Sequence, residues 1–140
     1  MVQIFGPVIY VLAAITISVS DLRYRIIRNR DLLLFFFASV ACNYSNLRLE
    51  SLRSLFYISL FCIALNHLFQ GKIGAGDLKL FWVISIWTSN FTEWLEGLTI
   101  AWILGGLFAI AFAALNFRRT QRKTSIPFAP FIFLGFLSAI

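Results

Sequence analysis

Residues 97–117 read GLTIAWILGGLFAIAFAALNF, an apolar run that contains no charged side chain. A helix needs about 17 to 25 residues to cross the roughly 30 Å hydrocarbon layer of a bilayer, so this run is long enough. Comparable runs recur along the chain, which is 60% hydrophobic and only 13% charged. Soluble domains are far less apolar. The sequence therefore predicts an all-α integral membrane protein.

The apolar runs predict six transmembrane helices. We expect them at residues 3–20, 32–46, 53–70, 78–92, 97–117 and 125–140. The second and fourth are short and would reach the interface through polar ends or local thinning of the bilayer. The first lacks the basic start of a signal peptide, so we expect it to be retained. Because no repeat or long linker interrupts the pattern, residues 1–140 are expected to form a single six-helix membrane domain.

The basic residues gather on one side of this predicted topology. Ten of the twelve fall on or beside the odd-numbered connections: Arg23, Arg25, Arg28, Arg30, Lys72, Lys79, Arg118, Arg119, Arg122 and Lys123. Arg48 and Arg53 lie on the other side. By the positive-inside rule, the odd-numbered connections are cytoplasmic and both termini face outward. The net charge of +6 therefore reflects membrane topology and attraction to anionic lipid, and we expect no nucleic-acid partner.

Two acids flank the apolar runs at the predicted cytoplasmic boundary. Asp21 ends the first run, and Asp77 directly precedes the fourth, after Gly74 and Gly76. Two carboxyls in one partly dry site cannot both ionise cheaply, so one serves as acid and the other as base. The glycines permit unusual backbone angles and close approach of a substrate. The plainer alternative is a loop between helices in which Asp77 caps the following helix.

Three stretches carry a resemblance to a known family. Asp21-Leu-Arg-Tyr-Arg-Ile-Ile-Arg-Asn29 resembles a motif in which an aspartate precedes a basic stretch and Ile-Pro-Asn. Gly74-Ala-Gly-Asp-Leu-Lys-Leu80 matches the signature G-x-G-D-x-K-[LF], and Ile126-Pro-Phe-Ala-Pro-Phe131 resembles I-P-F-x-P-F. The chain in this respect resembles the prepilin peptidases, intramembrane aspartyl proteases that process type IV and Flp-type pilins. Its small size resembles the Tad/Flp-locus members.

This resemblance implies that Asp21 and Asp77 form a catalytic dyad that activates water. The reaction would remove the basic leader peptide from a type IV or Flp-like prepilin or pseudopilin. It would take place at the cytoplasmic face of a bacterial or archaeal inner membrane. Prepilin and membrane lipids are the implied partners, with pilus or secretion assembly machinery as a further candidate. No metal or organic cofactor is expected.

Other motif residues have two interpretations each. Lys79 either tunes the dyad or is an interfacial lysine whose stem lies along apolar surface. Asn29 is a candidate for supporting the site or for forming a turn. Pro127 and Pro130 either shape the substrate cleft or simply start the last helix. Arg28 stands where the family usually has proline, which bears on the rigidity of that connection.

The cysteines bear on a second activity found in larger relatives. Those relatives carry an N-terminal cytoplasmic domain with paired C-x-x-C motifs, associated with N-methylation of the mature pilin. Here Cys42 and Cys62 lie in apolar runs without that spacing, so we expect free cysteines. We therefore expect a peptidase with no N-terminal methyltransferase domain and no methyltransferase activity.

Two non-enzymatic alternatives remain open. Acids within membrane segments also mark proton relays, so Asp21 and Asp77 are compatible with a small transporter. An assembly factor for a secretion system that keeps the fold without the activity is a further possibility. Two acids at one membrane face favour the peptidase, because a relay needs acids at staggered depths.

Small and aromatic residues lead to two further expectations. Gly105, Gly106 and Gly135 are expected to permit close helix approach. The tryptophans are expected mostly at lipid-facing and interfacial positions: Trp82, Trp87, Trp94 and Trp102.

Overall fold

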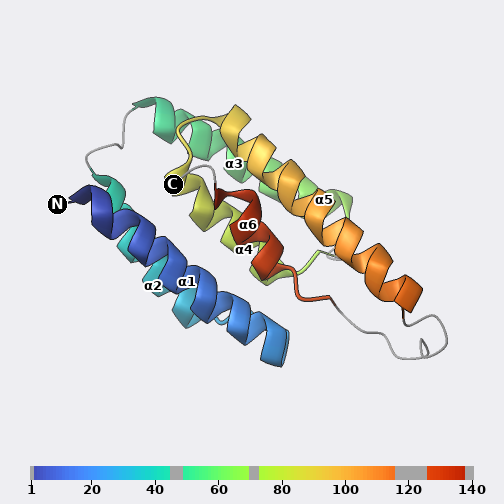
Figure 1. Cartoon of the computed structure of the whole chain (residues 1–140). Helices are drawn as coiled ribbons and strands as arrows, with labels where there is room; N and C mark the ends of the chain where they lie inside the picture. The colour runs from blue at the N-terminus through green and yellow to red at the C-terminus, as the bar shows by residue number, and fades with distance from the viewer. Residues whose placement is uncertain (1, 45–48, 70–72, 116–125, 138–140) are drawn as a thin grey trace.

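The computed structural model describes residues 2–44, 49–69, 73–115 and 126–137, and these ranges contain helices and no strand (Figure 1). The elements are α1 (Val2–Tyr24), α2 (Asn29–Asn43), α3 (Leu49–Leu68), α4 (Ala75–Ile84), the 3₁₀ turn η2 (Ser85–Trp87), α5 (Phe91–Leu115) and α6 (Ala129–Gly135). The predicted all-α class is confirmed.

Three of the described helices are long and apolar enough to cross a membrane. They are α1 over Phe5–Tyr24, α3 over Leu49–Leu68 and α5 over Phe91–Leu115. The other helices are shorter, with 15 residues in α2, 10 in α4 and 7 in α6. At 1.5 Å per residue, α4 is about 15 Å long, roughly half the hydrocarbon thickness. The chain thus has the character of a membrane protein, whereas six complete crossings stay a prediction.

The predicted helices 78–92 and 97–117 have different bounds, because the chain turns before residue 91. The side-chain oxygen of Asn90 accepts a hydrogen bond from the Glu93 amide at 2.9 Å. The Glu93 carboxylate in turn accepts one from the Ser89 amide at 2.8 Å. This reciprocal pair satisfies amides that a helix start leaves free. It begins α5 six residues before the predicted start, and α4 ends at Ile84.

The last helix also starts later than residue 125. Residues 126–128 are not helical, and α6 begins at Ala129. Pro130 is its second residue, where the missing proline N–H costs no hydrogen bond. α2 and α3 begin three or four residues before their predicted starts. The predicted ends at 45–46, 70, 116–117 and 138–140, together with the predicted start at residue 125, lie outside the described residues.

The two shortest helices occupy the centre of the bundle. α4 contacts α2, α3 and α6, while α6 contacts α1, α4 and α5, and Figure 1 shows both short helices flanked by the longer ones. The most deeply buried side chains come from all of these helices and include Tyr10, Ile58, Leu80, Trp94 and Ile132. The short helices are thus core elements, and they carry Asp77 and the last motif into the interior.

The prediction of mostly lipid-facing tryptophans is wrong for Trp94, which is completely buried. Its indole Nε1–H donates to the Phe81 carbonyl at 3.0 Å, tying α5 to α4. The indole of Trp87 similarly donates to the Ser39 hydroxyl at 2.9 Å. A buried indole needs such a partner, and the partners come from distant segments that periodicity does not reveal.

Glycines bring α5 and α6 close together. A Cβ on Gly97 would lie 2.6 Å from the Phe136 ring, and one on Gly135 would collide with the backbone of Gly97. The predicted close approach is confirmed for Gly135 and for Gly105, whose Cβ would collide with the Phe128 ring. It is wrong for Gly106, where a Cβ would meet nothing within 4 Å.

Candidate active site

Asp21 lies near the end of α1 and is buried, with 6% of its surface exposed. Its Oδ2 accepts a hydrogen bond of 2.9 Å from the backbone amide of Ala129, the first residue of α6. Pro130 has no amide hydrogen, and the amides of Phe131 and Ile132 donate to the Phe128 carbonyl. The Ala129 amide is therefore the first-turn donor that remains for the aspartate, and it fixes the orientation of the carboxyl.

Asp77 lies in the first turn of α4. Gly74 is the N-cap, and its carbonyl accepts hydrogen bonds from the Asp77 and Leu78 amides at 3.0 and 3.2 Å. Asp77 is therefore not the N-cap residue, which removes the simplest structural reason for its presence. A Cβ on Gly74 would lie 2.7 Å from Asp77 Oδ2. The glycine thus leaves room for the carboxyl.

Gly76 has a different neighbour. A Cβ at this position would lie 3.0 Å from Cβ of Ile27, in the connection between α1 and α2. Its missing side chain therefore lets the start of α4 approach the segment that follows Asp21.

The charge of Asp21 acts on the carboxyl of Asp77. Burial, and secondarily the charge of Asp21, raise the pKa of Asp77 from 3.8 to about 6. Asp77 lies outside the three helices that qualify as membrane spans. Because Coulomb interactions weaken with distance, this contribution indicates that the two acids, 56 positions apart in the sequence, lie within electrostatic range of each other. Their catalytic role stays a prediction.

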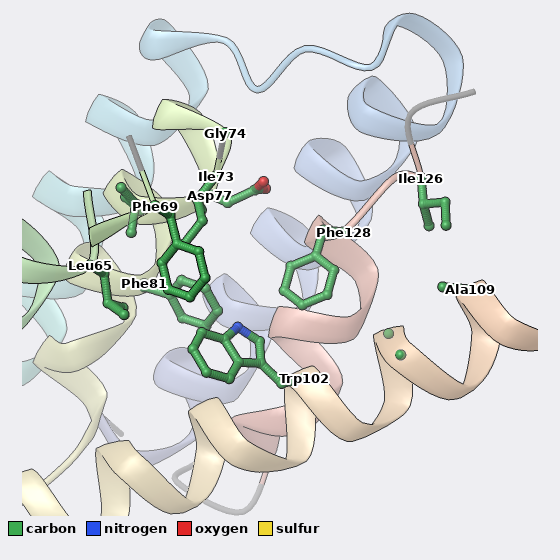
Figure 2. Close-up of a pocket in the computed structure, with 13 residues that line it drawn as sticks. Leu65, Phe69, Ile73, Gly74, Asp77, Phe81, Trp102, Ala109, Ile126 and Phe128 are labelled. Carbon is green, nitrogen blue, oxygen red and sulfur yellow. The ribbon is translucent and has the colours of Figure 1, made fainter. Parts of the chain in front are cut away.

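An apolar cavity of about 490 Å³ opens beside Asp77 (Figure 2). Its lining comes from the end of α3, the start of α4, the middle of α5 and the segment before α6. The residues are Leu65, Phe69, Ile73, Gly74, Asp77, Leu78, Phe81, Trp102, Gly105, Gly106, Ala109, Ile126 and Phe128. Figure 2 shows the Phe81, Trp102 and Phe128 rings around the space, with the Asp77 carboxyl at one end. An apolar wall with one titratable group is typical of a binding or active site.

The other predicted site residues are distributed around this centre. Gly74 lines the cavity, whereas Gly76, Pro127 and Pro130 do not. Lys79 Nζ donates to Asn29 Oδ1 at 3.0 Å, which joins α4 to α2 away from the cavity.

Sequence reasoning missed the residues that form the cavity walls. Ile126 and Phe128 flank Pro127 in the last motif, so the motif itself pointed to them. Trp102 and Gly105 are one turn apart on α5. The glycine pair was a usable signal, because a bulky ring fills the space that Gly105 leaves.

Arg28 has the backbone conformation that proline would impose. Its φ is −73° and its ψ is 129°, close to the proline φ of about −65°. Its guanidinium lies 5.2 Å from the centroid of the Tyr24 ring, a cation–π distance. At the position where the family motif has proline, the connection between α1 and α2 is thus stabilised by the contact of Arg28 with the Tyr24 ring.

Candidate metal ligands do not gather in the described part of the chain. No group of three or more His, Cys, Asp or Glu side chains there could hold a metal ion. The predicted absence of a cofactor remains a prediction. Cys42 and Cys62 are free and half-buried, as expected.

Comparison with known proteins bears on what this arrangement is for. Residues 8–110 match the profile of the type IV leader peptidase family. The chain belongs to this family. It is also 29% identical over 147 aligned residues to the prepilin leader peptidase/N-methyltransferase of Bacillus subtilis (strain 168). That alignment covers 98% of this chain and 55% of the relative, so the chain spans about half the relative's length. No solved structure matches the chain.

Both aspartates lie within the part that matches the family, whereas Ala129, the partner of Asp21, lies beyond it. The family match therefore includes both candidate acids but does not include the segment that orients one of them.

Proposed function

We propose that this chain is an intramembrane aspartyl endopeptidase that removes the basic leader peptide from type IV or Flp-like prepilins or pseudopilins. Family membership supports leader-peptide processing as the reaction class. The observation that carries the mechanism is the Asp77 carboxyl, whose pKa is raised to about 6 at the edge of an apolar cavity. Asp21 is the second acid of the pair.

The chemistry needs one proton and one negative charge on this pair. The ionised carboxylate accepts a proton from water as the water oxygen attacks the scissile carbonyl carbon. The protonated carboxyl donates a hydrogen bond to the carbonyl oxygen, which becomes negative as the tetrahedral intermediate forms. Collapse of the intermediate breaks the C–N bond, and a carboxyl gives the leaving amine a proton. The two apparent pKa values belong to the pair.

The protein supports this chemistry through orientation and exclusion of water. The Ala129 amide occupies one oxygen of Asp21, which leaves the other oxygen for water. The aromatic wall of the cavity gives an apolar segment of substrate a place to bind beside Asp77. Because a helical peptide bond is shielded by its neighbours, we propose that the substrate is extended where its leader meets the site.

We place the site at the cytoplasmic face of an inner membrane, with both termini outside. The distribution of basic residues supports this orientation. Reporter fusions at the connections, compared for cytoplasmic and external activity, test it directly. A cytoplasmic signal from the connection after α2 would contradict the orientation.

We propose that this chain cleaves the prepilin without methylating the amino terminus of the mature pilin. Mass spectrometry of the mature pilin tests this, with the expected product carrying an unmodified amino terminus. A mass increase of one methyl group that requires only this chain would contradict the proposal.

The deciding experiment is coexpression with the prepilin of the same organism, followed by immunoblotting for precursor and mature pilin. Asp21→Asn and Asp77→Asn are each expected to lower processing by about 10²-fold or more, the usual loss for an acid–base group. Asp31→Asn is the matched control, because Asp31 pairs with the exposed Arg30 at 3.6 Å. It should process normally.

Equal processing by the wild type and both dyad variants would show that the pair is not catalytic. Membrane levels of each variant are compared on the same blot, so that loss of protein is not mistaken for loss of activity. If the wild type cleaves nothing but carries protons across vesicles, and the two variants do not, a proton relay replaces the peptidase.

A further inference from the structure

A second apolar groove lies between α2 and α4, away from Asp77. Its volume is about 470 Å³. The lining consists of Asn29, Leu32, Leu33, Phe36, Lys79, Trp82 and Val83. None of these residues lines the cavity beside Asp77. The groove is therefore a separate feature with its own chemistry.

The polar and apolar parts of this groove are ordered along its length. Asn29 is the first residue of α2, and Lys79 lies in the second turn of α4. The apolar residues Phe36 and Val83 lie further along these two helices. At 1.5 Å per residue, the step from Asn29 to Phe36 is about 10 Å. One end of the groove is thus charged, and the rest of it is apolar over about two helical turns.

The Lys79 ammonium is available to an anion. It is exposed and spends one donor on Asn29 Oδ1 at 3.0 Å. Within the described ranges no ion pair of Lys79 with a carboxylate is found. An ammonium has three donors, so two remain for an incoming group.

We propose that this groove binds one acyl chain of an anionic phospholipid, whose phosphate pairs with Lys79. The groove is open on the outer surface of the bundle, where Leu33 is 56% exposed. A phosphate alone would satisfy the ammonium but leave the apolar part of the groove empty. A neutral lipid would fill the groove but leave the ammonium without a net anionic partner. An anionic lipid satisfies both, and it ties the start of α2 to α4.

Quenching of tryptophan fluorescence by brominated lipids tests this, because Trp82 lines the groove. The full chain in a non-ionic detergent is titrated with brominated phosphatidylglycerol and with brominated phosphatidylcholine. The wild type should prefer phosphatidylglycerol by about five-fold, the effect of one basic residue at an anionic surface. Trp82→Phe should remove most of the difference in signal, which assigns it to the groove.

Two variants separate the contribution of the lipid headgroup from that of the acyl chain. Lys79→Gln should bring the preference to about one, whereas Arg53→Gln, a matched loss of a cation elsewhere, should keep the wild-type preference. Leu33→Phe fills the groove from an exposed position without adding a tryptophan, and it should weaken quenching by both lipids. Circular dichroism confirms that each variant keeps its helix content.

Three results would overturn the proposal. The first is an equal response of the wild type to the two lipids, and the second is a preference that survives in Lys79→Gln. The third is displacement of the brominated lipid by inorganic phosphate alone, which would show that the site binds an anion but no acyl chain. If Leu33→Phe instead converts a dimer to a monomer on size-exclusion chromatography, a second copy of the chain covers the groove and the lipid assignment fails.

Discussion

Replacing Asp77 with asparagine is expected to stabilise the folded chain above pH 6 and to have little effect below pH 4. Burial and the charge of Asp21 raise the pKa of Asp77 from 3.8 to about 6. Between these values the folded state binds more protons than the unfolded state. The stability of the wild type therefore falls as the pH rises through this window. Asparagine has no charge to bury, so the variant avoids that loss.

The size of the effect follows from the shift itself. A change from 3.8 to about 6 corresponds to about 3 kcal/mol at 1.36 kcal/mol per unit. Solvent that reaches the half-buried carboxyl reduces this value, so it is an upper limit. For a chain of this size, 1 kcal/mol shifts the unfolding temperature by roughly 3–4 °C. The variant should therefore melt up to about 10 °C higher than the wild type at pH 8.

The assay is thermal unfolding in a fixed detergent at a series of pH values from 4 to 8, followed by intrinsic fluorescence. Asp31→Asn is the control, and its difference from wild type should stay small and flat, because its ion-pair partner Arg30 is exposed and such a pair contributes about 0–1 kcal/mol. Asp21→Asn is a second variant measured over the same pH series. Asparagine keeps an oxygen for the Ala129 amide but removes the charge, so the pH-dependent loss attributed to Asp77 should become smaller.

A variant Asp77→Asn that melts below the wild type at pH 8 would refute this reasoning. So would a difference between the two proteins that is the same at pH 4 and pH 8. The first result would mean that the Asp77 carboxyl makes a favourable contact when ionised. The second would mean that its pKa does not differ between the folded and unfolded states.

The glycine pair of α5 and the α1–α2 connection provide the remaining predictions. Gly105→Ala should lose about 1–3 kcal/mol, because its Cβ collides with the Phe128 ring and overpacking has that cost. Gly106→Ala, which meets open space, should be neutral or gain up to about 1 kcal/mol, because alanine suits a helix interior better than glycine does. Thermal unfolding of the two variants checks this, and equal losses would contradict it. Arg28→Pro should change stability by less than about 1 kcal/mol, since the gain from a stiffer unfolded chain offsets the lost contact with Tyr24. A drop of more than about 2 kcal/mol in denaturant unfolding would show that the φ of Arg28 is not the relevant feature.

The sequence was sufficient to predict that the two acids lie at the same end of the bundle. Alternation of apolar runs predicts Asp21 and Asp77 at the same end of the bundle, and the charge of Asp21 contributes to the raised pKa of Asp77; their pairing as a catalytic dyad stays a prediction. This succeeded because each acid lies at a helix end, where its height is set by topology alone. A shift of two or three residues in a helix boundary does not change it.

Helix lengths were less predictable, because hydrophobicity does not distinguish lipid from protein core. α4 and α6 are as apolar as a membrane span, yet they are short and packed inside the bundle. The start of α5 was readable in principle, since Asn90 and Glu93 have the spacing of a reciprocal cap. The hydrogen bond between Ala129 and Asp21 was not readable, because it depends on how the last helix packs against the first.

That hydrogen bond has a consequence for how the protein is made. Asp21 leaves the ribosome early, and its donor follows 108 residues later. Until the last helix is inserted, the carboxyl has no backbone amide from α6 to orient it. Under the proposed function, a chain still being synthesised would hold both acids but could not yet use them. Under that proposal, the order of synthesis delays completion of the site until α6 has been inserted.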